Sequence, residues 1–434
     1  MSDWREEYQR KLVSPDEAVR CIESGDQVFT YAQAAMPVAL MEALARRKDE
    51  LRDVTVYGAN TMYPYSILQS SDYRGKINYA TFFFQGYEHQ YFDRGNVSII
   101  SPHFSRLAKC LSDVYHVNVL MMEVAPPDEE GYLYFGIVGT AAGWDVAQKA
   151  DKIILQINRK QPRAHGYHNR IHIRDVTWLT ECDQPLPEYL QPESSEVDRK
   201  ISELILPMIP DGATLQLGLG GLSNAIGYGL KDRRNLSIHT EMYSDSMMYL
   251  AKRGAISGKQ VAGFAQGSQA LYDYISEGHV EFMPLSIIND PVEISKNDNM
   301  ISINTCIMAD LTGQVCSESI GFRQYSGTGG QLDFLEGAAL SPGGKAFICL
   351  TSSFTNKKGE MVSRINPVLT PGDIVTDPRS LAYYIVTEYG GVNLVGCSTW
   401  ERAERLISIA HPKFRDELIS NAEKQGIWIR SNKR

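Results

Sequence analysis

VDRKISELILPMIPDGATLQLG, residues 197–218, is the stretch that decides the fold. From Val197 to Met208 the apolar residues recur with the period of an amphipathic helix. Pro210-Asp211-Gly212 ends that helix, because proline and glycine together favour a turn. The chain then resumes from Ala213 to Gly218 with the composition of a short buried strand.

A similar phrase, SPDEAVRCIESGDQVFT, occupies residues 14–30. Ser14 is suited to cap a helix and Pro15 to stand at its first position. The helix is expected to stop at Ser24-Gly25-Asp26, and Gln27 to Thr30 has the pattern of a strand. The same order of helix, turn and strand at the start of both halves predicts a duplicated α/β domain. Chance similarity of one short phrase is the alternative.

Two polar stretches that contain proline, Asp183–Glu188 and Gln191–Glu196, predict a linker between the halves. We therefore expect an N-terminal domain over residues 1–185 and a C-terminal domain over residues 186–434. Further strands are predicted at Val54–Tyr57, Val117–Met122, Lys152–Ile157, Glu281–Leu285 and Ala346–Leu350, and helices at residues 38–50, 140–150 and 401–424. Strands that alternate with helices indicate two open α/β domains with mostly parallel sheets, and ligands bind such sheets beyond the carboxyl ends of the strands.

The overall composition narrows the class of protein. The chain has 434 residues, of which 43% are hydrophobic and 22% charged, as in globular proteins. A net charge of −9 argues against a nucleic-acid surface, and no apolar run is long enough to span a membrane. The acidic start of the chain is unlike a secretory signal. Seven scattered cysteines without a Cys-x-x-Cys pair predict reduced thiols in the cytoplasm, not disulfides or a zinc site.

Glycines cluster where a strand is expected to give way to a helix, at Leu217-Gly218-Leu219-Gly220-Gly221-Leu222-Ser223. Glycines at such a place let backbone amides approach an anion or a thioester oxygen, although a plain tight turn explains them equally well. The loop is not the dinucleotide fingerprint, because Ser223 stands where the third glycine belongs. The sequence also has no Gly-x-Ser-x-Gly elbow, no His-Glu-x-x-His and no P-loop, which disfavours serine hydrolases, zincins and P-loop enzymes.

Two further segments hold candidate site residues. Leu236 to Thr240 is predicted to be a short buried strand that ends in a carboxylate, Glu241. By itself Glu241 fits a solvated or capping acid. His239 could pair with Glu241 on the same face of the strand, and a hydrogen-bonded core histidine is the alternative. A second glycine turn, Ser326-Gly327-Thr328-Gly329-Gly330, is followed by Gly343-Gly344-Lys345, whose lysine could meet a phosphate or lie on the surface.

Together these phrases resemble the family-I CoA-transferases of the acetyl-CoA hydrolase/transferase group, in particular butyrate and 4-hydroxybutyrate CoA-transferases. The matching phrases of the second half, in order, are LQLGLGGLSNAI (215–226), IHTEMYSD (238–245), INDPVEISKNDNMISIN (288–304), GTGGQLDF (327–334), VTEYGGVNLVG (386–396) and ERAERLISIAHPKFR (401–415). The first half matches through SPDEAVRCIESGDQV (14–28), GYLYFG (131–136) and NRKQPRAHG (158–166). The resemblance thus covers nearly the whole chain.

The resemblance implies a covalent mechanism with Glu241 as the nucleophile. The glutamate attacks an acyl-CoA thioester, and the released CoA thiolate then converts the mixed anhydride into a glutamyl-CoA thioester. The acceptor carboxylate reverses these steps, so ping-pong kinetics are expected. CoA is a substrate in this scheme, and no metal or permanently bound cofactor is implied. A homodimer or higher homo-oligomer is the family expectation, with the active site in the crevice between the two domains.

The resemblance also assigns roles to other residues of this chain. The backbone amides of Leu222 and Gly330 would stabilise the oxyanion of each tetrahedral intermediate. Asn297 would steady Glu241. The CoA site would be lined by Gly218, Leu219, Gly220, Gly221, Leu222, Ser326, Gly330 and Lys345.

Two departures from the family pattern bear on the substrate. Ser223 replaces a usual proline and leaves the amide donors in place. In His103-Phe104-Ser105-Arg106, expected near the acyl pocket, Arg106 replaces a usual acid. A guanidinium there could bind a second carboxylate, so the acid could be succinate or itaconate in place of butyrate or 4-hydroxybutyrate, with acetyl-CoA or succinyl-CoA as donor. A surface arginine is the alternative. For the whole chain, an acyl-CoA hydrolase and a non-catalytic CoA-binding sensor remain alternatives.

Overall fold

The computed structural model describes residues 4–31, 33–190 and 192–427, which form two compact units. The first unit extends to Leu190 and also takes in Glu241–Asp245 and Gln260–Asn289. The second extends from there to Thr240 and includes Ser246–Lys259 and the chain from Asp290 onward. The division thus falls close to the expected linker, whose Gln191 lies outside the described residues, as does the start of the chain. The domain boundaries at residues 185 and 186 stay a prediction.

The first sheet has seven strands in the order β10-β7-β5-β1-β2-β3-β4. All its described pairings are parallel. The strands are β1 (Gln27–Phe29), β2 (Val54–Gly58), β3 (Ile77–Thr81), β4 (Val97–Ile99), β5 (Val119–Val124), β7 (Lys152–Ile157) and β10 (Trp178–Glu181).

The second sheet has nine strands in the order β25-β24-β20-β15-β11-β12-β13-β14-β8. Its described pairings are parallel except that between β24 and β25. The strands are β8 (His165–Gly166), β11 (Thr214–Leu217), β12 (Leu236–Tyr243), β13 (Ile256–Ala265), β14 (Glu281–Phe282), β15 (Met300–Thr305), β20 (Lys345–Cys349), β24 (Tyr384–Thr387) and β25 (Gly390–Asn393).

The two sheets share one topology. Without the outermost strands β25 and β8, the second sheet reads β24-β20-β15-β11-β12-β13-β14, which repeats the strand order of the first sheet along the chain. The strands of the two repeated sequence phrases, β1 and β11, occupy the same central position. The predicted pair of similar, mostly parallel α/β sheets is therefore confirmed.

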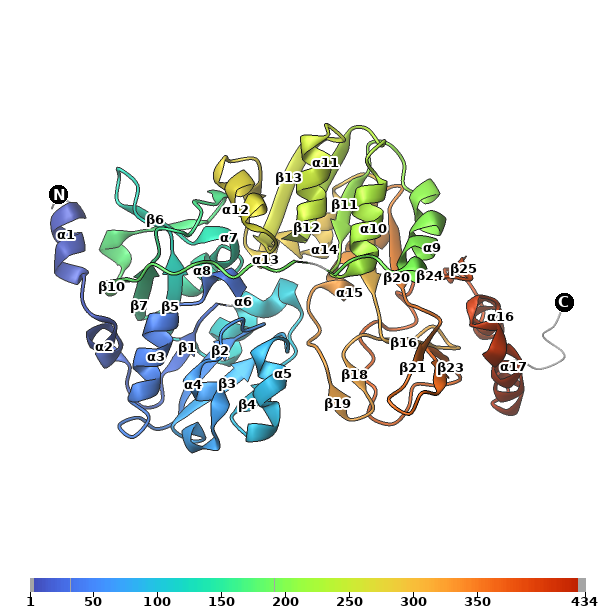
Figure 1. Ribbon diagram of the computed structural model, residues 1–434, viewed down its shortest axis with the longest axis horizontal. Coiled ribbons are helices and arrows are strands. Elements are labelled where there is room, and N and C mark those ends of the chain that lie inside the picture. Colours follow the sequence, from blue (N-terminus) through green and yellow to red (C-terminus); the bar gives the residue numbers. More distant parts are fainter. Residues whose placement is uncertain (1–3, 32, 191, 428–434) are drawn as a thin grey trace. The chain divides into compact units, whose positions relative to one another are not determined.

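Helices run alongside the strands of both sheets (Figure 1). Those of the first half are α1 (Trp4–Lys11), α2 (Pro15–Ala18), α3 (Val38–Arg46), α4 (Ser66–Gln69), α5 (Tyr87–Tyr91), α6 (Leu107–Lys109), α7 (Gly136–Gly139) and α8 (Gly143–Ala147). Those of the second half are α9 (Glu196–Ile205), α10 (Gly221–Gly229), α11 (Asp245–Lys252), α12 (Gln269–Ser276), α13 (Leu285–Ile288), α14 (Pro291–Ser295), α15 (Gln331–Leu340), α16 (Thr399–Ile409) and α17 (Arg415–Lys424).

Small sheets complete the units. They are formed by β6 (Tyr132–Tyr134) with β9 (Arg170–His172), by β16 (Met308–Asp310) with β17 (Val315–Cys316) and β23 (Ile365–Asn366), by β18 (Ser319–Ile320) with β19 (Arg323–Gln324), and by β21 (Ser353–Thr355) with β22 (Met361–Ser363).

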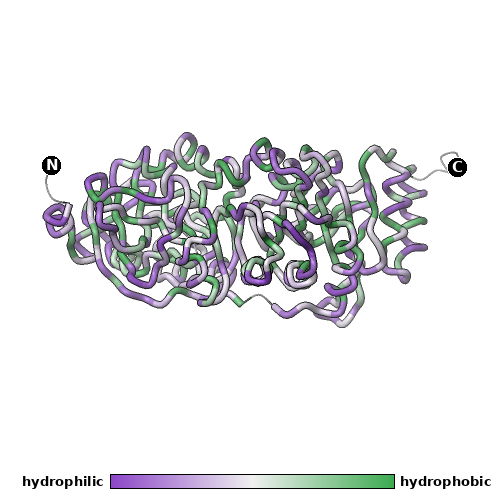
Figure 2. The backbone as a smooth tube through the Cα atoms, turned by 90° about the horizontal axis from the view of Figure 1, so that it is seen from above, coloured by the Kyte–Doolittle hydropathy of each residue, from purple (hydrophilic) through white to green (hydrophobic). Residues whose placement is uncertain are grey.

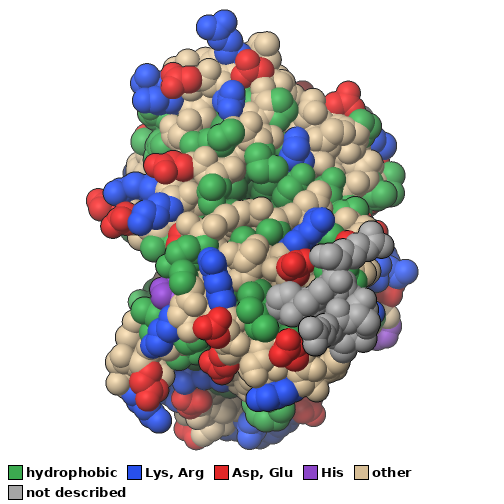
Figure 3. All heavy atoms as spheres, turned by 90° about the vertical axis from the view of Figure 1, so that its right-hand side faces the viewer, with side chains coloured by type: hydrophobic (Ala, Val, Ile, Leu, Met, Phe, Trp, Pro, Cys, Tyr) green, Lys and Arg blue, Asp and Glu red, His purple; other side chains and the backbone are tan. Residues whose placement is uncertain are grey.

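The strands bury nearly continuous apolar runs, as central parallel strands do. All six residues of β5 are buried, and so are five of the six in β7. The terminal helices α16 and α17 instead alternate between hydrophobic and hydrophilic turns (Figure 2). Acidic and basic side chains are interspersed over the described part of the face shown in Figure 3.

Five predicted elements differ clearly from the structure. The helix predicted at 38–50 is α3, which ends at Arg46. The helix predicted at 401–424 is two helices, α16 and α17, because Pro412 has no backbone N–H to continue the first. The helix predicted at 140–150 is limited to α8. The strand predicted over Glu281–Leu285 is only β14, and Leu285 begins α13 instead. The strand predicted to end at Thr240 continues to Tyr243, so Glu241 lies inside β12.

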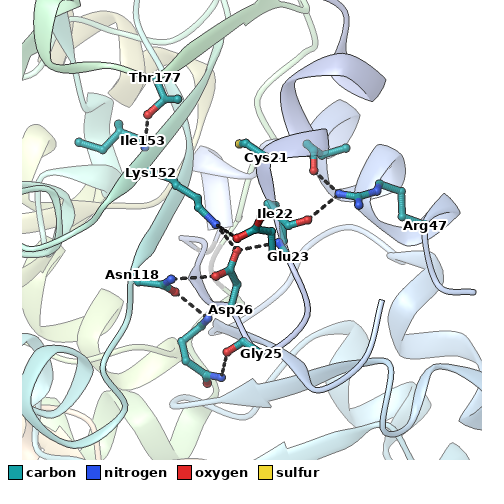
Figure 4. Close-up of polar contacts among 12 residues, drawn as sticks. Cys21, Ile22, Glu23, Gly25, Asp26, Arg47, Asn118, Lys152, Ile153 and Thr177 are labelled. Carbon is teal, nitrogen blue, oxygen red and sulfur yellow. Dashed lines mark hydrogen bonds and ion pairs between the residues drawn. The ribbon is translucent and has the colours of Figure 1, made fainter. Parts of the chain in front are cut away.

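The predicted turn at Ser24-Gly25-Asp26 is fixed by a buried carboxylate (Figure 4). Asp26 accepts hydrogen bonds from the Glu23 N–H, the Lys152 ammonium and the Asn118 amide, each at 2.8 Å. Burial opposes ionisation, but these three donors outweigh it and lower the pKa of Asp26 below its ordinary value. The network joins the start of β1 to β7 at the amino end of the sheet.

Replacing Asp26 with asparagine is expected to destabilise the fold by about 1.5–3 kcal/mol, the usual contribution of hydrogen bonds to charged groups. Because the folded-state pKa is lowered, the stabilisation is present above the ordinary carboxyl pKa and is lost as pH falls through the folded-state value. Urea unfolding of both proteins between neutral and acid pH measures this. In Asp49→Asn, which breaks an exposed ion pair with Lys76, stability should change little. Equal stabilities of wild type and Asp26→Asn at neutral pH would contradict the prediction.

The described residues contain no helix long and apolar enough to cross a membrane. The seven cysteines are free thiols. In the same part of the chain, no group of three or more His, Cys, Asp or Glu side chains is arranged to hold a metal ion.

Candidate active site

Glu241 lies on β12, half-buried, and a side-chain amide orients its carboxylate. The Asn289 amide donates to Glu241 Oε2 at 2.8 Å. Asn289 is 0% exposed and is the C-cap of the short helix α13. A fully buried donor at this distance fixes the position of one carboxylate oxygen. The arrangement presents an oriented carboxylate.

The helix that carries Asn289 is itself anchored within the first unit. The Leu285 N–H donates to the Ala141 carbonyl oxygen at 2.8 Å, and the Ser286 hydroxyl donates to Asp145 at 2.9 Å. Burial raises the pKa of Asp145. Gly263 on β13 has no room for a side chain, since a Cβ there would approach the Leu285 side chain to 2.5 Å. These contacts set the position of α13 and so of Asn289.

The segment predicted to border the acyl pocket lies next to that helix. Residues Phe104–Arg106 form a 3₁₀ turn, and this turn packs on α13. His103 and Ser105 are half-buried, whereas Arg106 is exposed at the N-cap of α6. The structure thus brings the His103–Arg106 segment against the helix that carries Asn289, with the guanidinium of Arg106 toward solvent.

Tyr31 is a second neighbour of Glu241. Its side chain is buried just after β1, and its ring packs edge-on against Phe29. Burial raises the pKa of the Tyr31 hydroxyl, and the negative charge of Glu241 raises it further. Tyr31 therefore stays protonated and neutral.

His239 and Asn297 form a separate contact. His239 is buried, and its Nδ1 lies 3.2 Å from the Asn297 amide nitrogen. The ring also packs edge-on against Phe334. His239 is thus the hydrogen-bonded core histidine that one alternative expected. Asn297 also donates to the Ile294 carbonyl oxygen at 2.8 Å, and the amide that contacts Glu241 is that of Asn289.

The first glycine loop joins β11 to α10, as predicted. Gly220 has φ +108°, a conformation that side chains rarely adopt, and the helix begins at Gly221. Gly218 is packed closely, since a Cβ on it would lie 3.1 Å from Asn304 Oδ1. The N-terminus of α10 therefore directs the amides of Gly221 and Leu222 outward from the carboxyl end of the sheet. Leu219 and Gly220 are half-buried beside them.

A buried polar cluster lies on the strands next to this loop. Asn304 accepts from the Gln216 amide at 3.1 Å and donates to Gln216 Oε1 at 3.1 Å. The Ser302 hydroxyl donates to Gln216 Oε1 at 2.7 Å. These side chains come from the neighbouring strands β11 and β15, next to the point where the loop leaves the sheet.

The second glycine loop lies at the same edge of the same sheet. Gly330 is buried and is the N-cap of α15, which packs on β15 and β20. Only residues 341–344 connect the end of α15 to the start of β20. Because this connection is short, α15 runs antiparallel to the strands, and its N-terminus lies at their carboxyl ends. The Ser326 N–H donates to the Glu318 carbonyl oxygen at 3.2 Å, which ties down the start of the loop. Both predicted glycine loops are thus amide-rich helix starts.

Lys345 lies at the opposite end of the sheet. It is the first residue of β20 and pairs with Ile301, which pairs with Leu215 on β11. Gly218 lies three residues beyond Leu215, which is about 10 Å farther along the strand direction at the usual rise per residue. The structure therefore does not bring Lys345 to the glycine loop, and the alternative of a lysine after a surface turn fits its position.

The sequence alone does not identify Asn289 or Tyr31 as site residues. Asn289 lies inside the matched phrase INDPVEISKNDNMISIN, so the phrase pointed to its neighbourhood. Its spacing from Glu241 gives no indication of contact. Nothing in the sequence around Tyr31 distinguishes it from a core aromatic residue.

Comparison with known proteins agrees with this architecture. The chain matches the acetyl-CoA hydrolase/transferase N-terminal domain over residues 1–187 and the C-terminal domain over residues 267–422. It is 42% identical to the butyryl-CoA:acetate CoA-transferase of Anaerostipes caccae, covering 99% of this chain and 100% of the relative. It is 37% identical to the 4-hydroxybutyrate coenzyme A transferase of Clostridium kluyveri, covering 98% and 100%.

A solved structure shows the same fold. RipA from Yersinia pestis superposes with a TM-score of 0.91 at 36% identity, covering 98% of this chain and 100% of RipA. The chain therefore belongs to the acetyl-CoA hydrolase/transferase family and is a CoA-transferase.

Proposed function

We propose that this enzyme transfers CoA from acetyl-CoA or succinyl-CoA to a free four- or five-carbon acid, through a glutamyl-CoA thioester on Glu241. The observation that carries the proposal is the carboxylate of Glu241, held at 2.8 Å by the fully buried amide of Asn289. A carboxylate that was only solvated at the surface, or that only capped a helix, would not need a buried donor. Butyrate, 4-hydroxybutyrate, succinate and itaconate are the acids we put forward.

In the proposed cycle, an oxygen of the Glu241 carboxylate attacks the thioester carbonyl and the C–S bond breaks. This leaves an acyl-glutamyl anhydride and a CoA thiolate, which attacks the glutamyl carbonyl and releases the acyl group as its carboxylate. The acceptor carboxylate then attacks the glutamyl thioester, and the same two steps run in reverse. No proton enters or leaves the overall exchange. Asn289 fits this cycle, because it orients the carboxylate without protonating it.

Each tetrahedral intermediate carries an oxyanion, and the amides of Leu222 and Gly330 are the donors we propose for it. Both amides are at helix starts, where backbone N–H groups have no partner inside the helix. Gly218 to Leu222 and Ser326 are the residues we propose for the CoA site. We further propose that the enzyme works in the cytoplasm as a homodimer or higher homo-oligomer.

A product analysis tests the function. Purified protein is incubated with acyl-CoAs, each paired with a panel of free carboxylic acids, and products are followed by mass spectrometry. We expect new acyl-CoA esters without net loss of CoA esters. When both substrates are varied, double-reciprocal plots of the initial rates should give the parallel lines of a ping-pong mechanism. Free CoA formed without an acceptor would identify a hydrolase. Binding of CoA esters without any turnover would identify a sensor, and either result would overturn the proposal.

Replacing Arg106 with glutamine distinguishes the acids. If the exposed guanidinium binds a second carboxylate, kcat/KM for succinate or itaconate should fall by about 1.5–3 kcal/mol of lost charged hydrogen bonding. Butyrate turnover should barely change in the same variant. Lys109→Gln, which removes an exposed cation three residues farther along the chain at the end of α6, serves as the charge-matched control. Equal losses for both acids, or none for either, would return Arg106 to an ordinary surface position.

A further inference from the structure

A buried carboxylate in β5, Glu123, takes no part in the steps above. It is 0% exposed and accepts four hydrogen bonds, all from side-chain amides. Its Oε1 accepts from Asn158 at 3.0 Å and Gln161 at 2.9 Å, and its Oε2 accepts from Gln156 at 3.1 Å and Gln184 at 2.6 Å. We call Glu123 with these four residues the amide cage. Two of its members belong to NRKQPRAHG, a matched phrase to which no role was assigned.

The amide cage also binds a second part of the backbone, the segment from Ala34 to Ala39 that leads into α3. The bonds run from Gln161 Nε2 to the Ala34 carbonyl oxygen (2.6 Å), from Gln184 Nε2 to the Met36 carbonyl oxygen (2.8 Å), and from the Ala39 N–H to Gln156 Oε1 (3.0 Å). Three amides therefore connect one buried carboxylate to three points along six residues of chain.

That segment directly follows residues near the nucleophile. Tyr31, whose hydroxyl experiences the charge of Glu241, lies three residues before Ala34. Gln33 has φ +55°, a conformation that costs a non-glycine residue free energy and persists only where the surroundings enforce it. The buried Thr30 Oγ1 and Gln33 Oε1 also have no hydrogen-bond partner among the described residues. Backbone strain and unsatisfied buried polar atoms require an explanation, and a constraint imposed by function is one such explanation.

Stability alone does not explain why a carboxylate stands at the centre of this cage. Taking a carboxylate out of water costs several kcal/mol, and packed apolar side chains fill such a site at least as well. What a carboxylate offers is four directed acceptor positions, which fix amides from different segments in one geometry. The geometry fixed here is that of the segment Ala34–Ala39, which follows Tyr31 in the chain.

We propose that Glu123 is a positioning residue for CoA transfer: through its amide cage it holds Ala34–Ala39 in place, the segment that follows Tyr31 in the chain. The proposal rests on the proposed function of Glu241. A displaced segment would leave the nucleophile intact but misplace the groups around it. Misplacement by about 1 Å can lower an enzymatic rate by up to about 10²-fold.

The test is Glu123→Gln, which keeps the shape but directs an N–H toward donors of the cage. We expect kcat to fall by about 10–100-fold, in line with such misplacement. The KM for acyl-CoA should stay nearly unchanged, because the loops proposed for CoA belong to the other unit. Hydrogen exchange of the peptide covering residues 33–40, followed by mass spectrometry, should become faster than in wild type. This exchange readout does not depend on activity, so it remains informative even if the proposed function fails.

Two further variants keep the test decisive. The double variant Glu123→Gln/Gln156→Glu returns a carboxylate to the cage, where it can still accept from the Ala39 N–H. This double variant should recover much of the kcat lost in Glu123→Gln. Gln184→Ala removes two bonds without burying a new donor, so it tests the same idea if Glu123→Gln does not fold. Asp26→Asn is the matched control, since it weakens the same sheet at the opposite end and should leave kcat unchanged.

Kinetics of Glu123→Gln within twofold of wild type would overturn the proposal, whether or not exchange of residues 33–40 changes. So would a loss of kcat that Asp26→Asn reproduces at equal loss of stability, because the effect would then be one of general stability. Failure of the wild type to transfer CoA at all would instead reject the proposed function, and unchanged exchange in Glu123→Gln would separately reject the anchoring of the segment.

Discussion

Glu241→Ala is expected to lose CoA transfer and the covalent CoA adduct together. The loss of a nucleophile that carries every step of a covalent cycle lowers kcat by on the order of 10⁴–10⁶-fold in enzymes where it has been measured. Glu241→Asp keeps the charge but shortens the side chain by one methylene, and misplacement of this size costs about 10²-fold. The two variants should therefore differ by at least two orders of magnitude.

Covalent trapping measures the chemistry directly. Wild-type protein incubated with acyl-CoA and then reduced with borohydride should yield one modified peptide, the one that contains Glu241. The same peptide from Glu241→Ala should be unmodified. Glu281→Gln, an exposed acid on the nearby strand β14, is the control and should give the wild-type adduct and rate. Full activity in Glu241→Ala, or an adduct on any other residue, would contradict the assignment.

Glu241→Ala should remain folded, which makes the measurement clean. The side chain is only half-buried, and the fully buried Asn289 amide that donates to it belongs to the same unit. Removal of the acceptor leaves a buried donor behind, at a cost of about 1–3 kcal/mol. Wild-type and variant proteins should therefore unfold in the same way at moderately different denaturant concentrations.

The topology could be predicted from sequence because its determinants are local. Proline and glycine at 210–212 and the turn at 24–26 end helices through backbone geometry alone, so the repeated phrase marks two equivalent central strands, β1 and β11. The break between α16 and α17 was also encoded locally, by Pro412, but the helical periodicity on both sides of it favoured one long helix.

The candidate site was only partly predictable, because its contacts join distant parts of the chain. The glycine loops are recognisable since each is a short motif between a strand and a helix. Asn289 contacts Glu241 only because the tertiary fold brings the end of α13 to β12, and no spacing rule predicts this contact between residues 48 positions apart. The expected placement of Lys345 beside the glycine loop is not found, for a related reason. The sequence shows that a lysine begins a strand, but the register of the sheet decides how far that lysine lies from a loop at the other end.

Gly330→Val is expected to lower kcat by about 10²–10³-fold, the range observed for loss of one oxyanion donor. The backbone of Gly330 has φ −107° and ψ 8°, which residues other than glycine can adopt, so valine does not strain the turn. Gly330 is buried at the start of α15, so we expect a branched side chain there to hinder the approach of an oxyanion to its N–H. The amide would persist but could no longer approach the oxyanion.

Three measurements separate this effect from loss of stability. The rate of adduct formation on Glu241 should fall by the same factor as kcat, because both steps pass through an oxyanion, whereas Gly330→Ala should lose less. Gly337→Ala is the control in the same helix: a Cβ at Gly337 would approach the Ile294 side chain to 2.5 Å, so this variant should unfold more easily yet retain kcat. A folded Gly330→Val enzyme with unchanged kcat would exclude its amide as an oxyanion donor. The proposed hole would then have to rely on the Leu222 amide, at the start of α10.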